Sequence, residues 1–126
     1  MVAIKKSKPI KSVDKFTVSI DFQLEVLRFL IQSKESLLII NKIKPGYFAL
    51  IEHALIMEGL RKFVKKYHKI PSQALLIESC TQLLESKEYI DLVTRDDVPG
   101  IIKMIKNLFS SPLKDHDVIQ ENILKF

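Results

Sequence analysis

The fold of this chain is decided by residues 43–71, IKPGYFALIEHALIMEGLRKFVKKYHKIP. Apolar residues recur through this stretch at spacings of three, four and seven: Ile51, Leu55, Ile56, Leu60, Phe63, Val64 and Tyr67. This spacing predicts an amphipathic helix of about five turns, from about Ala49 to His68. Gly59 in its interior costs about 1 kcal/mol relative to alanine, so we expect another helix to approach closely there. The preceding aromatic pair, Tyr47 and Phe48, is expected to fill the junction with the segment before it.

Two helices are predicted before the long one. Ser19 or Asp21 can cap a helix that ends near Ser33, and its apolar stripe comprises Phe22, Val26, Phe29 and Leu30. A short helix over residues 37–40 follows and stops before Pro45, because a residue that precedes proline disfavours helical backbone angles. Its four consecutive apolar residues predict burial on nearly all sides.

Three further helices are predicted after the long one. Ser72 caps a helix that runs to about Glu85, and Asp96 or Asp97 caps the next, with Pro99 in its first turn. The last begins at Asp115 or Asp117. Residues 87–94 would pass for a short strand, but no second strand-like run exists to pair with them, so we expect a helix end or loop. The sequence predicts an all-α protein, a small bundle of six to seven helices.

Charge is unevenly distributed along the 126 residues, which carry a net charge of +5. Residues 1–15 hold five lysines against Asp14 alone and so contribute +4, leaving the remainder nearly neutral. We expect residues 1–15 to form a flexible basic leader. No apolar run approaches the length needed to span a bilayer, and the start lacks the apolar core of a signal peptide. We therefore expect a cytoplasmic protein that does not bind membranes.

Residues that could carry chemistry are few. Cys80 has no second thiol, and His53, His68 and His116 lie in separate segments without metal-ligand spacing. The sequence has three glycines and contains no glycine-rich phosphate-binding motif and no nucleophile-elbow motif. We expect no catalytic, cofactor or metal site in this chain.

An ordered set of short motifs nevertheless resembles a known family. The set begins with Phe22-Gln23 and Val26-Leu27. It continues with IKPGYF at 43–48, His53, KYHKIPS at 66–72 and LFSSP at 108–112, and it ends with Asp115-His116. The order and spacing resemble the N-terminal domain of DnaB-type replicative hexameric DNA helicases. The phage, T-even-like branch is the most similar, and the resemblance covers about residues 20–126.

The resemblance implies a domain plan and a set of partners. Residues 16–113 would form a helical collar domain, and residues 114–126 the first arm of a truncated helical hairpin. Primase, the helicase loader and neighbouring helicase subunits would be its partners, in the cytoplasm of a bacterial host if a phage encodes it. ATP, Mg²⁺, DNA translocation and the ATP-dependent helicase activity would belong to a motor domain outside this chain. Because the hairpin is incomplete, we expect a mostly monomeric chain at micromolar concentration.

Two groups of residues are candidates for contact with partners. The polar end of the long helix, which we expect to bind the partner protein, comprises Arg61, Lys62, Lys65, Lys66 and Lys69. The last helix carries a stripe that we expect to mediate self-association: Val118, Ile119, Ile123 and Phe126. A purely structural interpretation of both groups stays open. The cations could stabilise the negative end of the helix dipole, and the apolar stripe could pack against the rest of the bundle.

Two other functions remain open from the sequence. The chain could be a stand-alone adaptor or inhibitor that binds a replicative helicase or primase, and only a motor domain encoded downstream would separate this from the collar domain. Direct binding of single-stranded nucleic acid is the less favoured alternative. Base stacking needs exposed aromatic side chains among cations, and Tyr67 is the only aromatic residue that lies among the cations in such a position.

Overall fold

The computed structural model describes residues 19–125, and within them it is all-α, without a strand. Six α-helices follow one another: α2 (Ile20–Gln32), α3 (Ser36–Ile39), α4 (Ile51–Tyr67), α5 (Gln73–Leu83), α6 (Val98–Ser110) and α7 (His116–Asn122). Short 3-10 turns lie at Ile40–Lys42, Pro45–Tyr47, Arg95–Asp97 and Ile123–Lys125. The predicted small helical bundle is confirmed. The proposed leader at 1–15, and Phe126, lie outside the described residues.

The helix boundaries follow local capping signals. The Ser19 side chain accepts a hydrogen bond from the backbone N–H of Phe22, and that of Ser72 accepts one from Leu75. These bonds satisfy backbone donors that have no partner inside the helix. Thr94 and Asp97 form a reciprocal capping box in front of α6, and Pro99 lies in its first turn as predicted.

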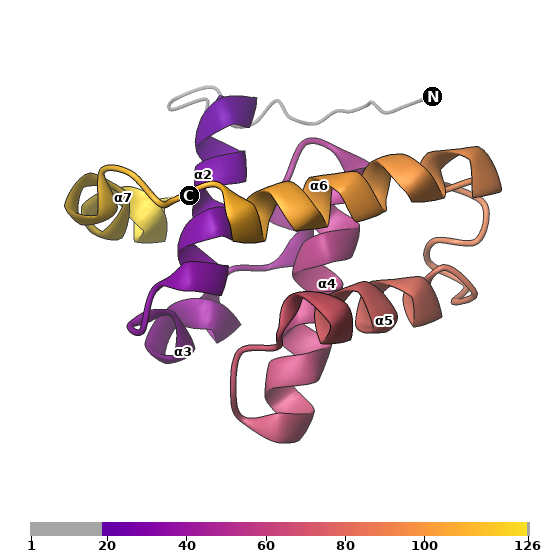
Figure 1. Cartoon of the computed structure of the whole chain (residues 1–126), viewed down its shortest axis with the longest axis horizontal. Helices are drawn as coiled ribbons and strands as arrows, with labels where there is room; N and C mark the ends of the chain where they lie inside the picture. The colour runs from indigo at the N-terminus through magenta and orange to yellow at the C-terminus, as the bar shows by residue number, and fades with distance from the viewer. Residues whose placement is uncertain (1–18, 126) are drawn as a thin grey trace.

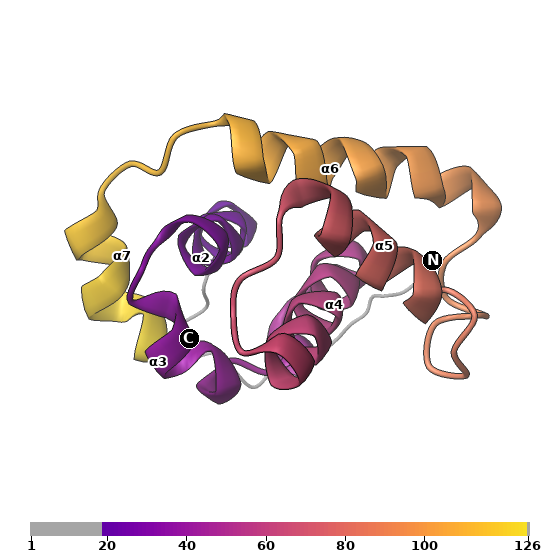
Figure 2. The same cartoon turned by 60° about the horizontal axis from the view of Figure 1, so that its bottom comes forward.

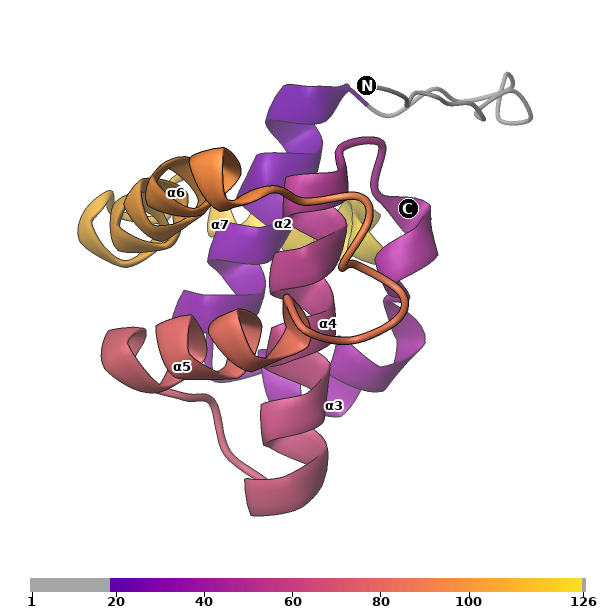
Figure 3. The ribbon, with the colours of Figure 1, turned by 90° about the vertical axis from the view of Figure 1, so that its right-hand side faces the viewer.

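The helices pack as two pairs, α2 with α4 and α5 with α6, and the second pair crosses the first (Figure 1). The helices α2 and α4 run side by side, α5 lies across α4, and α6 crosses α2 and runs antiparallel to α5. The turned views in Figures 2 and 3 show the same arrangement, with α7 on the side of α2 away from α4. The core therefore lies between α2, α4, α5 and α6, where the fully buried side chains include Phe29, Leu55, Leu60, Leu76 and Ile105. None of the described helices is long and apolar enough to cross a membrane.

Gly59 lies where α4 and α5 approach most closely. A Cβ atom at this position would be 2.7 Å from the Sγ of Cys80 and 3.4 Å from its backbone nitrogen. The neighbouring Ser79 Oγ donates a hydrogen bond to the carbonyl of Gly59 at 2.9 Å. The predicted close approach of another helix is thus found, and that helix is α5.

The segment before α4 differs from the prediction. Ile40 is buried, but Leu37 and Leu38 are exposed, Leu38 by 80%. The expectation that residues 37–40 are buried on nearly all sides is wrong, because α3 is a single turn that packs on α2 with one side. In the aromatic pair only Phe48 enters the core, whereas Tyr47 is exposed.

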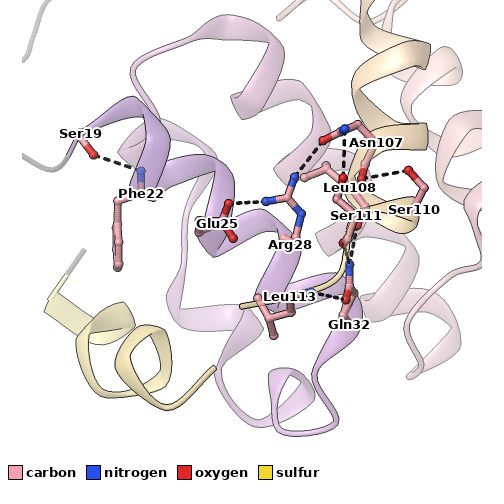
Figure 4. A network of polar contacts seen from close by, with 10 residues as sticks. All are labelled: Ser19, Phe22, Glu25, Arg28, Gln32, Asn107, Leu108, Ser110, Ser111 and Leu113. Carbon is pink, nitrogen blue, oxygen red and sulfur yellow. Dashed lines mark hydrogen bonds and ion pairs between the residues drawn. The ribbon is translucent and has the colours of Figure 1, made fainter. Parts of the chain in front are cut away.

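Polar side chains of α2 hold the end of α6 (Figure 4). Arg28, itself buried, donates to the Asn107 side chain at 2.8 Å and forms an ion pair with Glu25. Gln32 donates to the carbonyls of Leu108 and Ser111 at 2.8 and 2.7 Å. Its carbonyl oxygen accepts the N–H of Leu113 at 3.0 Å. One side chain thus satisfies three backbone groups where α6 ends.

Replacing Gly59 with alanine should destabilise the fold by about 1–3 kcal/mol, because the added methyl group overlaps the Cys80 sulfur. The free energy of unfolding is measured by chemical denaturation. Gly100→Ala in α6 is the matched control, since a Cβ there meets nothing within 4 Å and alanine should be neutral or stabilising. Cys80→Ala should recover part of the loss when combined with Gly59→Ala. A Gly59→Ala protein as stable as the original would contradict the close contact.

Gln32→Ala should cost about 1–2 kcal/mol, because it removes three hydrogen bonds from backbone groups at the end of α6. Gln82→Ala is the control, because Gln82 is exposed and its side chain makes one 3.3 Å bond to Glu78. Amide hydrogen exchange should accelerate selectively around residues 111–113. Equal effects of the two substitutions would argue against a special role for Gln32.

Candidate partner-binding surface

The C-terminal end of α4 projects beyond the crossing with α5 (Figures 1 and 3). On its inner side Phe63 and Val64 are buried, while Lys62, Lys65 and Lys66 are exposed on the outer side. The helix ends at His68, whose left-handed backbone (φ 57°) turns the chain back toward α5. The projecting end is therefore held by a few apolar contacts and presents its cations to solvent.

The five cations predicted for partner contact all lie on this projecting end, which we call the basic end: Arg61, Lys62, Lys65, Lys66 and Lys69. Between Glu58 and Glu78 the sequence contains no carboxylate. None of the five is in an ion pair in the described part of the chain. The negative pole of the α4 dipole offsets part of their mutual repulsion. The remaining positive charge is available to an anionic partner.

The basic end also presents an aromatic ring. Tyr67 is 51% exposed, its ring centroid lies 4.6 Å from that of Phe63, and the Nζ of Lys66 is 5.3 Å from its centroid. The Nε of Arg61 is buried and has no hydrogen-bond partner within residues 19–125. Tyrosine is enriched where proteins bind one another, and the surrounding positive charge would steer an anionic partner to it.

The residues predicted for self-association are divided between core and surface. Ile119 and Ile123 are buried against the rest of the bundle, and Val118 is exposed. Phe126 lies outside the described residues. The assignment of this stripe to self-association stays a prediction, and Val118 is its described member that could contact a partner without rearrangement.

His116 makes contacts that the sequence did not indicate. Its Nε2 lies 2.9 Å from Ser33 Oγ and 3.3 Å from a carboxylate oxygen of Glu35, and its ring packs against Phe29 with a centroid separation of 5.1 Å. Its Nδ1 is 3.4 Å from a carboxylate oxygen of Asp117. Ser33, Glu35 and Phe29 are separated from His116 by about 80 residues in the sequence, so local spacing could not reveal these contacts.

The order serine, histidine, aspartate resembles a hydrolytic triad, but the hydrogen bonds do not suit one. Ser33 Oγ donates its proton to Glu35 at 2.7 Å and accepts the backbone N–H of Glu35 at 3.2 Å, so the serine proton is directed at the carboxylate and not at His116. Ser33 is also buried. The bond from Ser33 lowers the pKa of Glu35, and its own backbone N–H and His116 lower it further. The cluster joins α7 to the turn between α2 and α3.

The other two histidines are placed differently. His53 is buried in α4 beside Phe48, and its Nδ1 has no hydrogen-bond partner. His68 is exposed at the end of α4. Within residues 19–125 no three side chains of histidine, cysteine, aspartate or glutamate are arranged to hold a metal ion.

The chain matches no protein-family model, no curated protein and no solved structure.

Burial lowers the pKa of His53 from 6.5 to about 4, so the unfolded chain binds a proton more readily than the folded one. Stability should therefore fall as the pH falls from about 6.5 to about 4, by roughly 3 kcal/mol if His53 acts alone. Denaturation midpoints measured across this range test the effect. His53→Leu should flatten the profile, and His68→Gln should leave it unchanged. An unaltered slope in His53→Leu would assign the pH dependence to other groups.

Proposed function

We propose that this chain is the N-terminal assembly and partner-docking domain of a DnaB-type replicative DNA helicase, similar to the phage branch. The observation that carries the proposal is the basic end, which projects from the bundle with an exposed tyrosine and no ion pairs within the described chain. The motif order supports the family, since IKPGYF and KYHKIPS frame α4 at its two ends. Primase and the helicase loader are the proposed partners.

In this proposal the chain binds and orients proteins, and chemistry occurs elsewhere. ATP and Mg²⁺ would be bound by a motor domain outside these residues, and DNA would be contacted by the full-length protein. The role of residues 19–125 would be to present the basic end at a fixed angle. The crossing of α4 and α5 at Gly59 supports this, because it holds the helix rigidly next to the projecting end.

A second candidate, a stand-alone adaptor that binds a helicase or primase, is favoured by one observation. Ile119 and Ile123 close the chain's own core instead of remaining free for a hairpin partner. A bundle that covers these residues internally needs no neighbouring collar domain for its stability. The two functions differ in whether the chain binds an intact hexameric helicase or acts as part of one.

The proposal predicts that Lys62→Glu, Lys65→Glu and Lys66→Glu together weaken binding to primase or loader at least about tenfold, or 1.4 kcal/mol. Isothermal titration calorimetry with each partner from the same replication system measures this. The control combines Lys103→Glu, Lys106→Glu and Lys114→Glu, which changes the net charge equally at exposed lysines outside the basic end. Equal loss in both variants would indicate a general charge effect. Binding to an intact helicase hexamer, without binding to primase or loader, would favour the adaptor.

A further inference from the structure

A strongly acidic surface lies at the other end of α5 from the basic end. Residues 78–97 contain six carboxylates against Lys87 and Arg95, a net charge of −4, whereas residues 59–77 carry +5. The carboxylates are exposed: Glu78, Glu85, Glu88, Asp91, Asp96 and Asp97. We call residues 85–96 the acidic turn; it holds four of these carboxylates against Lys87 and Arg95, a net charge of −2. Burial raises the pKa of Tyr89 in this turn, and the charges of Glu58 in α4 and of Glu88 in the turn raise it further.

The charges of the acidic turn are not neutralised within the described part of the chain. Among residues 19–125, no ion pair involves a carboxylate of this turn, although Lys87 and Arg95 lie in the same segment. Asp97, next to the turn, is occupied by the capping box with Thr94. The side chains of Glu85, Glu88 and Asp91 are in no hydrogen bond of the described chain. These carboxylates remain free for a cationic partner.

No ion pair joins the two surfaces within residues 19–125. The helices α4 and α5 cross at Gly59 and Cys80, and α4 then carries Lys62, Lys65 and Lys66 past this crossing. Figures 1 and 3 show the projecting end of α4 and the turn before α6 at different edges of the bundle. Their opposite charges therefore remain available for pairing between two copies.

Exposed apolar side chains accompany the charge on both surfaces. Ile90 and Leu92, in the acidic turn, are 56% and 58% exposed and flank Asp91, while Tyr67 is exposed among the lysines. A large apolar residue left in water gains from burial when a complementary surface covers it. The basic end and the acidic turn thus each combine exposed apolar side chains with charge, and their charges are of opposite sign.

We propose that the basic end of one copy docks on the acidic turn of a second copy, a head-to-tail contact. The inference rests on the proposed function, because it names a neighbouring subunit as a partner of the basic end. Joining two different surfaces makes the contact heterologous, so each added copy leaves one surface of each kind free. The contact depends on exposed charges and is therefore weak and screened by salt, which agrees with the expectation that the chain is mostly monomeric at micromolar concentration.

Sedimentation velocity at low salt (about 20 mM) and at concentrations up to about 500 µM tests the contact. The average mass should rise above the monomer mass of 14.6 kDa and return to it at about 300 mM salt. The basic-end variant (K62E, K65E, K66E) and an acidic-turn variant (E85K, E88K, D91K) should each remain monomeric. The K103E, K106E, K114E protein should associate like the original chain.

Mixing the two variants provides the decisive measurement. Opposite charges face each other again in the mixture, so association should return to near the original level. A monomeric original chain under these conditions, or a mixture that stays monomeric while each variant remains folded by circular dichroism, overturns the head-to-tail contact. So does undiminished association of either variant.

The outcome separates this inference from the proposed function. If the basic-end variant loses primase or loader binding while the original chain never self-associates, the docking function stands and the head-to-tail contact is wrong. If self-association follows the prediction and neither partner binds, the chain is an assembly surface only. If both hold, saturating primase should suppress self-association, because both would occupy the basic end.

Discussion

The crossing of α4 and α5 at Gly59 is the contact on which the rest of the structure depends. Without a side chain at this position, Cys80 lies against the backbone of α4 and Ser79 bonds to the carbonyl of Gly59. The crossing fixes the direction of α5, which in turn packs against α6. It also determines how much of α4 extends past the bundle. The exposure of the basic end is thus a consequence of where the glycine lies in the helix.

A second, polar contact organises the opposite part of the bundle. The side chains of Arg28 and Gln32 hold the end of α6, and Ser33 and Glu35 hold His116 at the start of α7. All four lie within two turns at the end of α2 and just beyond it. The C-terminal third of the described chain is thereby attached to α2 through directional bonds, whereas α5 is attached to α4 mainly through apolar packing.

The sequence predicted features that depend on neighbours close along the chain. The caps at Ser19 and Ser72 and the close approach at Gly59 are short-range or steric effects, so they can be read from spacing alone. The burial of residues 37–40 was predicted wrongly, because apolar character does not reveal whether anything packs on the outer side of α3. The run of cations at 61–69 is likewise visible in the sequence, whereas the contact of His116 with Ser33 joins residues some 80 positions apart. Buried Arg28 was missed, although its position between Leu27 and Phe29 was a signal.

Cys80 has a chemical consequence through the same crossing. Burial between the helices raises the pKa of its thiol from 9 to about 12, so almost no thiolate exists at neutral pH. The folded chain should therefore resist alkylation and oxidation, and covalent dimers should not form while α5 stays in place. A disulfide-linked dimer in a stored sample would mark molecules in which the two helices have separated. Oxidation of Cys80 would therefore report that α4 and α5 had separated at this contact.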